Sequence, residues 1–221
     1  MDSAMRFFNW AYKTRANTVK TIDAGEKVSP EKMFLSFCSH DPTLITNGPA
    51  GLNASIKGIG FVPKKEFLEH ILEKEYMPHI NSYNPEDKTY SERGLKILIK
   101  NLYSEEAEKN MDFSIITSLE MAKNHTYKNL LASQGKGEYN ATFSFYQPPM
   151  IAFELRGQCR MTEGDIYQKF INAQHDMYHA PNVERWPTRP SIIFTIKEVY
   201  DNSANKQGFG AQLEYPCPEW K

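Results

Sequence analysis

Two adjoining segments in the second half of the chain carry the residue pattern of paired β-strands. In residues 140–146, apolar and hydroxyl side chains alternate, which is the period of two expected when one face of a strand is buried. Residues 150–159 follow as a second strand-like run, and only Gln147-Pro148-Pro149 separates the two. A break this short leaves no room for a helix, so the pair predicts an antiparallel hairpin.

Further apolar runs predict more strands and several helices around this hairpin. The strands, each with a β-branched centre, are expected at residues 96–102, 112–117 and 191–196. The helices are expected in residues 1–20, after Pro63, in residues 118–132 and in residues 163–179. Strands in hairpin-length succession with helices between them predict a mainly β, α+β fold, an antiparallel barrel with covering helices.

The remaining segments set the expected domain organisation. Residues 29–62, rich in Pro, Gly, Asn and Ser, predict loops with one or two weak strands. Residues 77–92 predict a linker. We therefore expect a helical N-terminal extension over residues 1–40 and a barrel domain over residues 41–221, with a helical insertion at about residues 63–93.

The charge balance and the cysteines indicate which partners and which cell compartment to expect. The chain has 26 Lys and Arg against 27 Asp and Glu, so it lacks the basic excess typical of duplex nucleic-acid binding. No apolar run is long enough to span a bilayer. Three widely spaced cysteines, Cys38, Cys159 and Cys217, form no CxxC pair. We expect a cytoplasmic protein with no nucleic-acid partner and no membrane partner.

The segment Thr117-Ser118-Leu119-Glu120 has the form of a helix capping box, with Thr117 as N-cap and Glu120 at N3. A helix N-terminus offers unpaired amides and the positive end of the helix dipole, so it suits a phosphate. Lys123 lies about one and a half turns further on, and Lys100 is expected on the neighbouring strand. An ordinary capped helix with two solvated lysines and a phosphate site with two hydroxyls and two ammonium groups both fit this pattern.

Several short motifs follow one another in a recognisable order. Ile97-Leu98-Ile99-Lys100 precedes a charged turn, the strand ending at Thr117 comes next, and Lys123 follows six residues later. This order resembles the pyridoxamine 5′-phosphate oxidase superfamily, whose members have a V-L-L-K-like strand, a strand ending in threonine and then such a lysine. The resemblance covers about residues 94–201 and includes Phe143-Ser144-Phe145-Tyr146, Phe153-Glu154-Leu155-Arg156-Gly157 and Trp186-Pro187-Thr188-Arg189-Pro190.

The resemblance implies a split-barrel fold, a homodimer and FMN bound at the dimer interface. It also implies a strand hairpin before the V-L-L-K-like strand, for which residues 42–62 are the best candidate. The chain would then be an FMN-dependent oxidoreductase acting on an unidentified small molecule, because the flavin supplies the redox chemistry. The residues that would hold the flavin phosphate and its surroundings are Lys100, Thr117, Ser118 and Lys123. Trp186 and Arg189 would approach the flavin or substrate from the partner subunit.

The chain also departs from the family pattern. Typical members have an arginine five residues before the strand lysine and a Ser-Arg pair before the second lysine, where this chain has Leu95 and Met121-Ala122. A phosphate site would be rebuilt here, with Asn124 and His125 as candidates, and oxidation of pyridoxamine phosphate is not expected. The departures leave open a non-enzymatic module that holds a flavin, a haem or another cofactor.

His175 and His179 offer another alternative. Two histidines spaced i, i+4 on a helix can bind one metal ion, which would make the protein a metal-dependent enzyme. A polar helix face accounts for the same pair, because the sequence indicates no third ligand.

Overall fold

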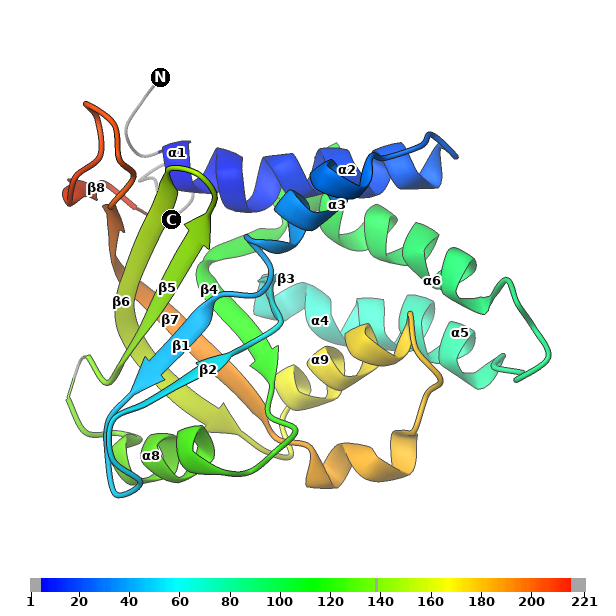
Figure 1. Cartoon of the computed structure of the whole chain (residues 1–221). Coiled ribbons are helices and arrows are strands. Elements are labelled where there is room, and N and C mark those ends of the chain that lie inside the picture. The colour runs from blue at the N-terminus through cyan, green and yellow to red at the C-terminus, as the bar shows by residue number, and fades with distance from the viewer. Residues whose placement is uncertain (1–4, 138, 216–221) are drawn as a thin grey trace.

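The computed structural model describes residues 5–137 and 139–215, and its centre is one antiparallel sheet (Figure 1). The strands run in the order β2-β1-β5-β6-β7-β4-β3, with β8 paired to β7. Their bounds are Thr43–Thr46 (β1), Asn53–Ile56 (β2), Ile59–Pro63 (β3), Met111–Leu119 (β4), Ala141–Gln147 (β5), Ile151–Thr162 (β6), Ser191–Asp201 (β7) and Ala211–Leu213 (β8).

Cys217 lies outside the described residues, and Cys38 and Cys159 are free thiols.

The strand order requires the sheet to curl. β2 and β3 stand at opposite ends of the order, yet only Lys57 and Gly58 separate them in the chain. The two edges of the sheet must therefore approach each other at this point, which makes the sheet a split barrel. β6 bends against β7 at a bulge beside Gly157, where a Cβ would lie 2.1 Å from the Thr195 carbonyl oxygen. Only glycine fits this close approach.

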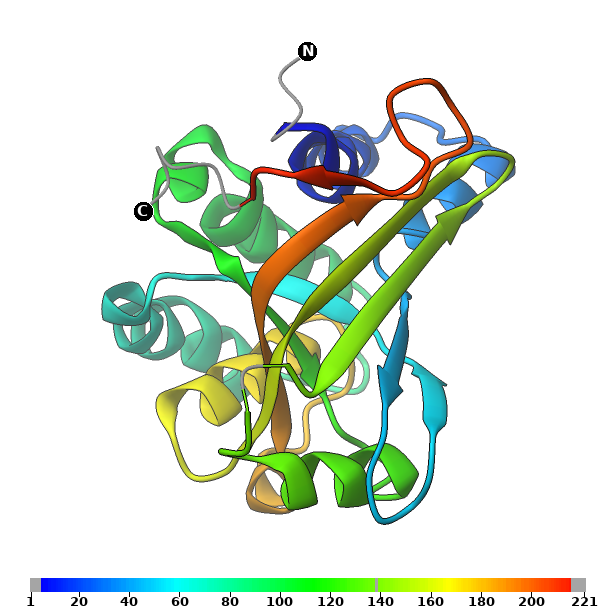
Figure 2. The same ribbon diagram turned by 90° about the vertical axis from the view of Figure 1, so that its left-hand side faces the viewer.

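Helices cover the barrel on several sides (Figure 1). Across the top lie α1 (Met5–Phe8), η1 (Asn9–Lys13), α2 (Thr14–Asp23) and α3 (Pro30–Phe37). The insertion between β3 and β4 forms α4 (Lys65–Ile71), η2 (Leu72–Tyr76), α5 (Met77–Asn81), α6 (Tyr90–Leu98), η3 (Ile99–Tyr103) and α7 (Glu105–Lys109). α8 (His125–Ser133) lies below the barrel, and α9 (Ile166–Asp176) packs on β4 and β7 before η4 (Val183–Thr188). Figure 2 shows that no helix lies in front of the outer face of β5, β6 and β7.

Aromatic side chains join the N-terminal helices to the barrel interior. The alternating residues of β5 and β6 place Phe145 and Phe153 inside, where both are buried. The Phe7 ring centre lies 5.6 Å from that of Phe145 and 5.3 Å from that of Phe153, both nearly edge-on. Trp10 packs beside them and donates from its indole Nε1 to Gln147 Oε1 at 2.8 Å. The N-terminal extension is therefore part of the barrel core.

The expected barrel, its hairpins and its helical extension are confirmed. The alternating segment forms β5 and pairs with β6, residues 42–62 contain the β1–β2 hairpin, and the expected helices at the N-terminus, after Pro63 and at residues 163–179 are present. α3 forms where loops were expected, because Ser29 caps its first turn by accepting from the Lys32 amide and Pro30 occupies the start of the helix.

The prediction of a strand at residues 96–102 was wrong. This segment continues α6 into η3, and Tyr90, Gly94, Leu98 and Leu102 recur every fourth residue toward the core. A short apolar run fits a strand and a buried helix equally well, and the packing of the whole insertion selects the helix. Residues 77–92, expected to be a linker, likewise contain α5 and the start of α6.

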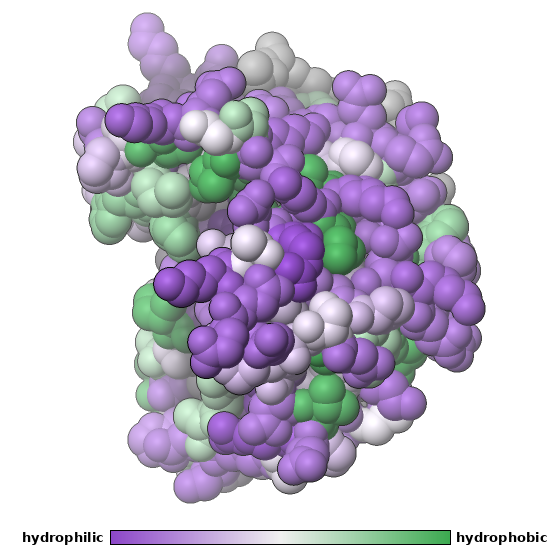
Figure 3. Space-filling model, turned by 90° about the vertical axis from the view of Figure 1, so that its right-hand side faces the viewer, coloured by the Kyte–Doolittle hydropathy of each residue, from purple (hydrophilic) through white to green (hydrophobic). Residues whose placement is uncertain are grey.

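Figure 3 shows the side of the molecule that lies on the right in Figure 1, and this surface is mostly hydrophilic. Apolar residues gather on the overhang at its upper left, where the end of α2 and α3 project from the body. On α3, Phe34 is 64% exposed and Phe37 is 46% exposed. Among the described residues, no helix combines the length and apolar character needed to cross a membrane.

Candidate functional site

The six residues expected at a cofactor lie in three separate places. Lys100 is in η3, where its Nζ pairs with Glu75 Oε1 at 2.6 Å and its side chain is 64% exposed. It was expected on a strand beside Thr117, but it belongs to the helical insertion. The structure therefore removes Lys100 from the neighbourhood in which the phosphate site was expected.

Thr117 and Ser118 are strand residues, and the prediction of a capping box at Thr117 was wrong. β4 continues to Leu119 because Thr117 pairs with Gly60 of β3 and with Ile193 of β7. Successive side chains on a strand point to opposite faces, so the two hydroxyls cannot meet at one phosphate. Thr117 Oγ1 donates to the Gly60 carbonyl at 3.1 Å, and Thr117 and Ser118 are both buried.

The chain between β4 and α8 is organised by Glu120. Its Oε1 accepts hydrogen bonds from the backbone amides of Ala122 and Lys123, each at 2.9 Å, and its Oε2 accepts from Lys57 Nζ at 2.7 Å. Glu120 is 2% exposed, so the Lys57 ammonium balances a buried charge. This turn holds Lys123 in the left-handed region, at φ 49°. We call Lys57, Glu120, Lys123 and the first turn of α8 the β4–α8 junction.

The first turn of α8 lies against β2. Thr126 Oγ1 accepts from Asn53 Nδ2 at 2.7 Å and is hydrogen-bonded to Ser55 Oγ at 2.8 Å. The N-cap residue, Asn124, makes no side-chain capping bond. Lys123 is exposed, with its Nζ 5.7 Å from the ring centre of Tyr127, and no carboxylate pairs with it among the described residues. The Lys123 ammonium group therefore lies close to the first turn of α8, and an ammonium group at a helix start suits an anion.

Trp186 and Arg189 meet at another buried carboxylate, Asp176 of α9. Trp186 Nε1 donates to Asp176 Oδ2 at 2.8 Å, and Arg189 Nη2 lies 3.2 Å from Oδ1. His175 Nδ1 and the Asn182 amide bind the same carboxylate, each at 2.9 Å. Burial alone would raise the pKa of Asp176, but these hydrogen bonds and the Arg189 charge together lower that pKa to about 2.

We call Asp176, Trp186, Arg189 and His175 the Asp176 cluster. Two amide side chains on α9 support it. Gln168 Nε2 donates to the carbonyls of Trp186 and Arg189 at 2.9 and 3.0 Å, and Asn172 Nδ2 donates to the Arg189 carbonyl at 3.0 Å. Trp186 and Arg189 are both 8% exposed, so both are largely committed to their own chain. Their approach to a flavin held by a partner subunit stays a prediction. Neither Gln168 nor Asn172 belongs to a motif that marks it in the sequence.

His175 and His179 lie side by side at the end of α9. Their ring centres are 4.6 Å apart and their planes are inclined by 35°. Partial burial and the charge of His175 lower the pKa of His179, although Asp176 opposes this shift. No group of three or more His, Cys, Asp and Glu side chains within the described part of the chain is placed to hold a metal.

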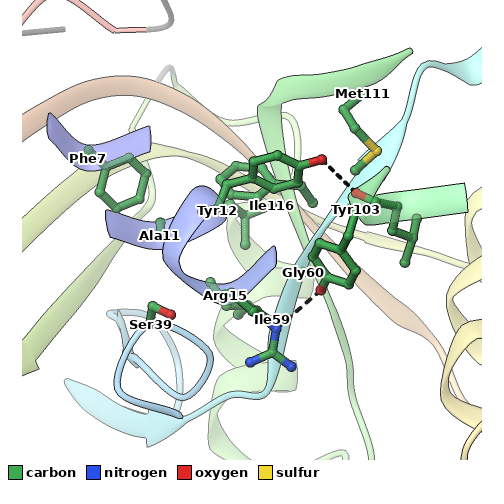
Figure 4. Close-up of a pocket in the computed structure, with 12 residues that line it drawn as sticks. Phe7, Ala11, Tyr12, Arg15, Ser39, Ile59, Gly60, Tyr103, Met111 and Ile116 are labelled. Carbon is green, nitrogen blue, oxygen red and sulfur yellow. Dashed lines mark hydrogen bonds between the residues drawn. The ribbon is translucent and has the colours of Figure 1, made fainter. Parts of the chain in front are cut away.

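The enclosed cavity of the barrel is too small for a cofactor. It lies between the N-terminal helix, β3 and η3 (Figure 4) and has a volume of about 20 Å³, roughly the room that one water needs. Arg15 Nε binds Tyr103 Oη at 3.2 Å at its edge, and Tyr12 Oη donates to the Leu102 carbonyl at 2.7 Å. This cavity does not accommodate a flavin.

A wider hollow lies on the open face of the sheet. Its volume is about 710 Å³, within the range of small-molecule sites. β1 and β5 contribute Thr46 and Thr142, and two cations, Lys136 and Arg156, line it together with Glu198. Arg156 Nε pairs with Glu154 Oε1 at 2.6 Å, so Glu154 balances part of the charge in this hollow.

No family model and no curated protein matches this chain. Among solved structures it is similar to a HupZ protein of Group A Streptococcus, with 10% identity, a TM-score of 0.44, and coverage of 84% of this chain and 98% of that one. It is also similar to an F420 reductase, with 13% identity, a TM-score of 0.38, and coverage of 72% and 87%. Neither likeness assigns a function at these TM-scores, and the strand order of the chain itself establishes the barrel.

Proposed function

We propose that this chain is a split-barrel protein that binds FMN by its phosphate at the β4–α8 junction and acts as a flavin-dependent oxidoreductase on a small molecule. The observation that carries the proposal is the position of Lys123. The side chain of Glu120 holds it in a left-handed turn directly before α8, whose N-cap side chain makes no capping bond. An ammonium group and the start of a helix thus face the same solvent region.

The donors at the junction fit a phosphate better than they fit a metal or a neutral ligand. Amide groups at a helix start and an exposed ammonium group bind anions. Lys57 is already balanced by Glu120, whereas Lys123 makes no ion pair among the described residues, so its charge is available to a ligand. Lys100 is excluded from the proposal, because it lies in η3 and pairs with Glu75.

The residues of this chain would position the cofactor and keep its phosphate end fixed. A bound flavin supplies the hydride or electron transfer itself. Lys123 would neutralise part of the phosphate charge, and Glu120 would act as a positioning residue by fixing the backbone at Lys123. Ser118 and Thr117 would contribute through the strand that leads into the turn, since both side chains are buried.

We also propose that the functional form is a homodimer with the cofactor at the interface. The enclosed cavity has room for about one water, whereas the hollow lined by Thr46, Thr142 and Arg156 has a volume of about 710 Å³. A second copy seated over that hollow would enclose a ligand that one chain leaves open. Sedimentation with and without FMN tests this arrangement, and a monomer at all concentrations in both states would exclude it.

The decisive experiment for the cofactor is a titration of the purified chain with FMN, followed by its visible absorption and fluorescence. Lys123→Ala should weaken FMN binding by about tenfold, since a hydrogen bond to a charged group contributes about 1.5–3 kcal/mol. Lys100→Ala is the matched control, because it removes an equivalent lysine outside the junction, and it should leave FMN binding unchanged.

Two results would overturn the cofactor proposal: a chain that takes up no FMN, or equal losses in the two lysine variants. Turnover then separates an enzyme from a binding module. Bound FMN that is reduced by NAD(P)H and reoxidised by a second substrate supports the oxidoreductase. FMN that stays bound and unreactive with every donor supports the non-enzymatic module.

A further inference from the structure

The paired histidines at the end of α9 are not explained by the proposed flavin site. His175 is on the last turn of α9, and His179 follows it in the turn after the helix. The side chain of His175 is 31% exposed, and His179 is exposed. The C-terminal end of a helix also carries a partial negative charge that favours a cation. The pair is therefore accessible to a dissolved ion.

The neighbouring carboxylate fixes which nitrogen of His175 is available. Asp176 already accepts from Trp186 Nε1 and the Asn182 amide, so its carboxylate acts as an acceptor and His175 Nδ1, 2.9 Å from Oδ1, donates to it. In the neutral ring, Nε2 then keeps its lone pair, and it has no hydrogen-bond partner among the described residues. A carboxylate bound to the far nitrogen of a ligating histidine is the usual second-shell arrangement at metal sites.

The distance between the two rings fits a shared ion. A metal held about 2.1 Å from one nitrogen of each ring lies about 3.2 Å from each ring centre. Ring centres 4.6 Å apart then correspond to an angle of about 90° at the metal, whereas a tetrahedral ion would hold them about 5.3 Å apart. When the free nitrogen of each ring points at the same ion, the observed separation is that of neighbouring positions on an octahedral or square-planar ion.

We propose that His175 and His179 form a two-histidine site for a divalent transition metal, with Asp176 as the second-shell residue that orients His175. The preferred ions are Cu²⁺ and Ni²⁺, since imidazole ligands at right angles suit their geometry. The pair provides two protein ligands, and water or a small ligand fills the other positions. Because Asp176 also holds Trp186 and Arg189, a bound metal stabilises the attachment of η4 to α9.

The test is a calorimetric titration of the untagged chain with NiCl₂ and CuCl₂ in a non-chelating buffer. The unmodified chain should bind one ion, and His179→Ala should bind it at least about tenfold more weakly, a loss that even second-shell changes commonly cause. His70→Ala is the matched control, because His70 is an exposed histidine on α4, and it should bind like the unmodified chain. Saturating metal should raise the melting temperature of the unmodified and His70→Ala chains, and not that of His179→Ala.

Three results would overturn the site: no stoichiometric binding by the unmodified chain, equal affinities in the unmodified chain and His179→Ala, or an equal loss in His70→Ala. His179 is exposed, so its replacement should leave the fold intact, and the melting temperature without metal checks this directly. The readout is independent of FMN, so failure of the flavin proposal would leave this one standing, and the reverse also holds.

Discussion

Glu120 and Asp176 are buried carboxylates that organise two polar regions of this molecule, and they leave their surroundings in different states. Glu120 is 2% exposed and Asp176 is 1% exposed. Glu120 binds one lysine and two backbone amides, and a second lysine remains exposed beside it. Asp176 binds Trp186, Arg189, His175 and the Asn182 amide. The β4–α8 junction therefore keeps groups available for a ligand, whereas the Asp176 cluster uses its donors to hold η4 on α9.

Removal of the Asp176 carboxylate should have the largest effect on stability. Asp176→Ala leaves the Arg189 guanidinium without its partner and Trp186 Nε1 without an acceptor, and both groups are buried. We expect a loss of about 3–5 kcal/mol in the free energy of unfolding, measured by urea denaturation. Asp23→Ala, an exposed carboxylate at the end of α2, is the control. A loss below about 1 kcal/mol would show that the cluster is not structural.

The corresponding change at the junction should cost less and separate stability from binding. Glu120→Gln removes the charge that faces Lys57 at 2.7 Å but keeps an oxygen for the two amides. We expect a loss of about 2–3 kcal/mol in the free energy of unfolding. FMN binding should not weaken, because a negative charge beside the proposed phosphate position is gone. Weaker FMN binding in the folded variant would contradict the placement of the phosphate beside Glu120.

Acid should weaken the Asp176 cluster in a defined range of pH. The folded-state pKa of Asp176 is about 2, below the usual value of about 3.9 for an unfolded chain. Its contribution is present above about pH 4 and is lost as the pH falls toward about 2, a difference of about 2 kcal/mol. Asp176→Asn should flatten this part of the pH–stability curve. An unchanged curve in that variant would assign the acid sensitivity to other carboxyl groups.

The smallest effect on stability should come from a change at Lys100. The sequence placed this lysine at the flavin phosphate, but it lies outside the β4–α8 junction. Its ion pair with Glu75 is largely exposed, with Lys100 at 64%, and exposed ion pairs contribute at most about 1 kcal/mol. Lys100→Ala should change the free energy of unfolding by less than about 0.5 kcal/mol, as measured by urea denaturation. A larger loss would mean that η3 depends on this lysine in a way that the contacts do not explain.

The spacing of apolar residues in the sequence identified the helices and strands that have one buried face and one exposed face. The alternation in β5 and the apolar stripe of α9 are visible in short windows of sequence, because each element has one buried face. Residues 96–102 gave no such distinction. Ile97, Leu98 and Ile99 are three consecutive apolar residues, so they show neither the period of a strand nor that of a helix. They form a helix because the insertion packs on the core.

The candidate site depended even more on distant contacts. Lys123 was identified by its place in the order of motifs, and the structure puts it before a helix, although that helix starts at His125. Lys57 went unnoticed because 63 residues separate it from Glu120, its partner. Asp176 is adjacent to His175 in the sequence, and its bonds to Trp186 and Arg189 form only when η4 folds back onto α9.

The sequence by itself determined that the chain forms an antiparallel barrel with a helical N-terminal extension, because alternation, turn residues and apolar stripes act over short distances. The tertiary structure decided which polar residues meet. Strand pairing carried Thr117 and Ser118 into β4, on opposite faces, and the two buried carboxylates selected their partners from remote segments. A buried charge must find a partner wherever the fold supplies one, and that choice depends on the packing of the whole molecule.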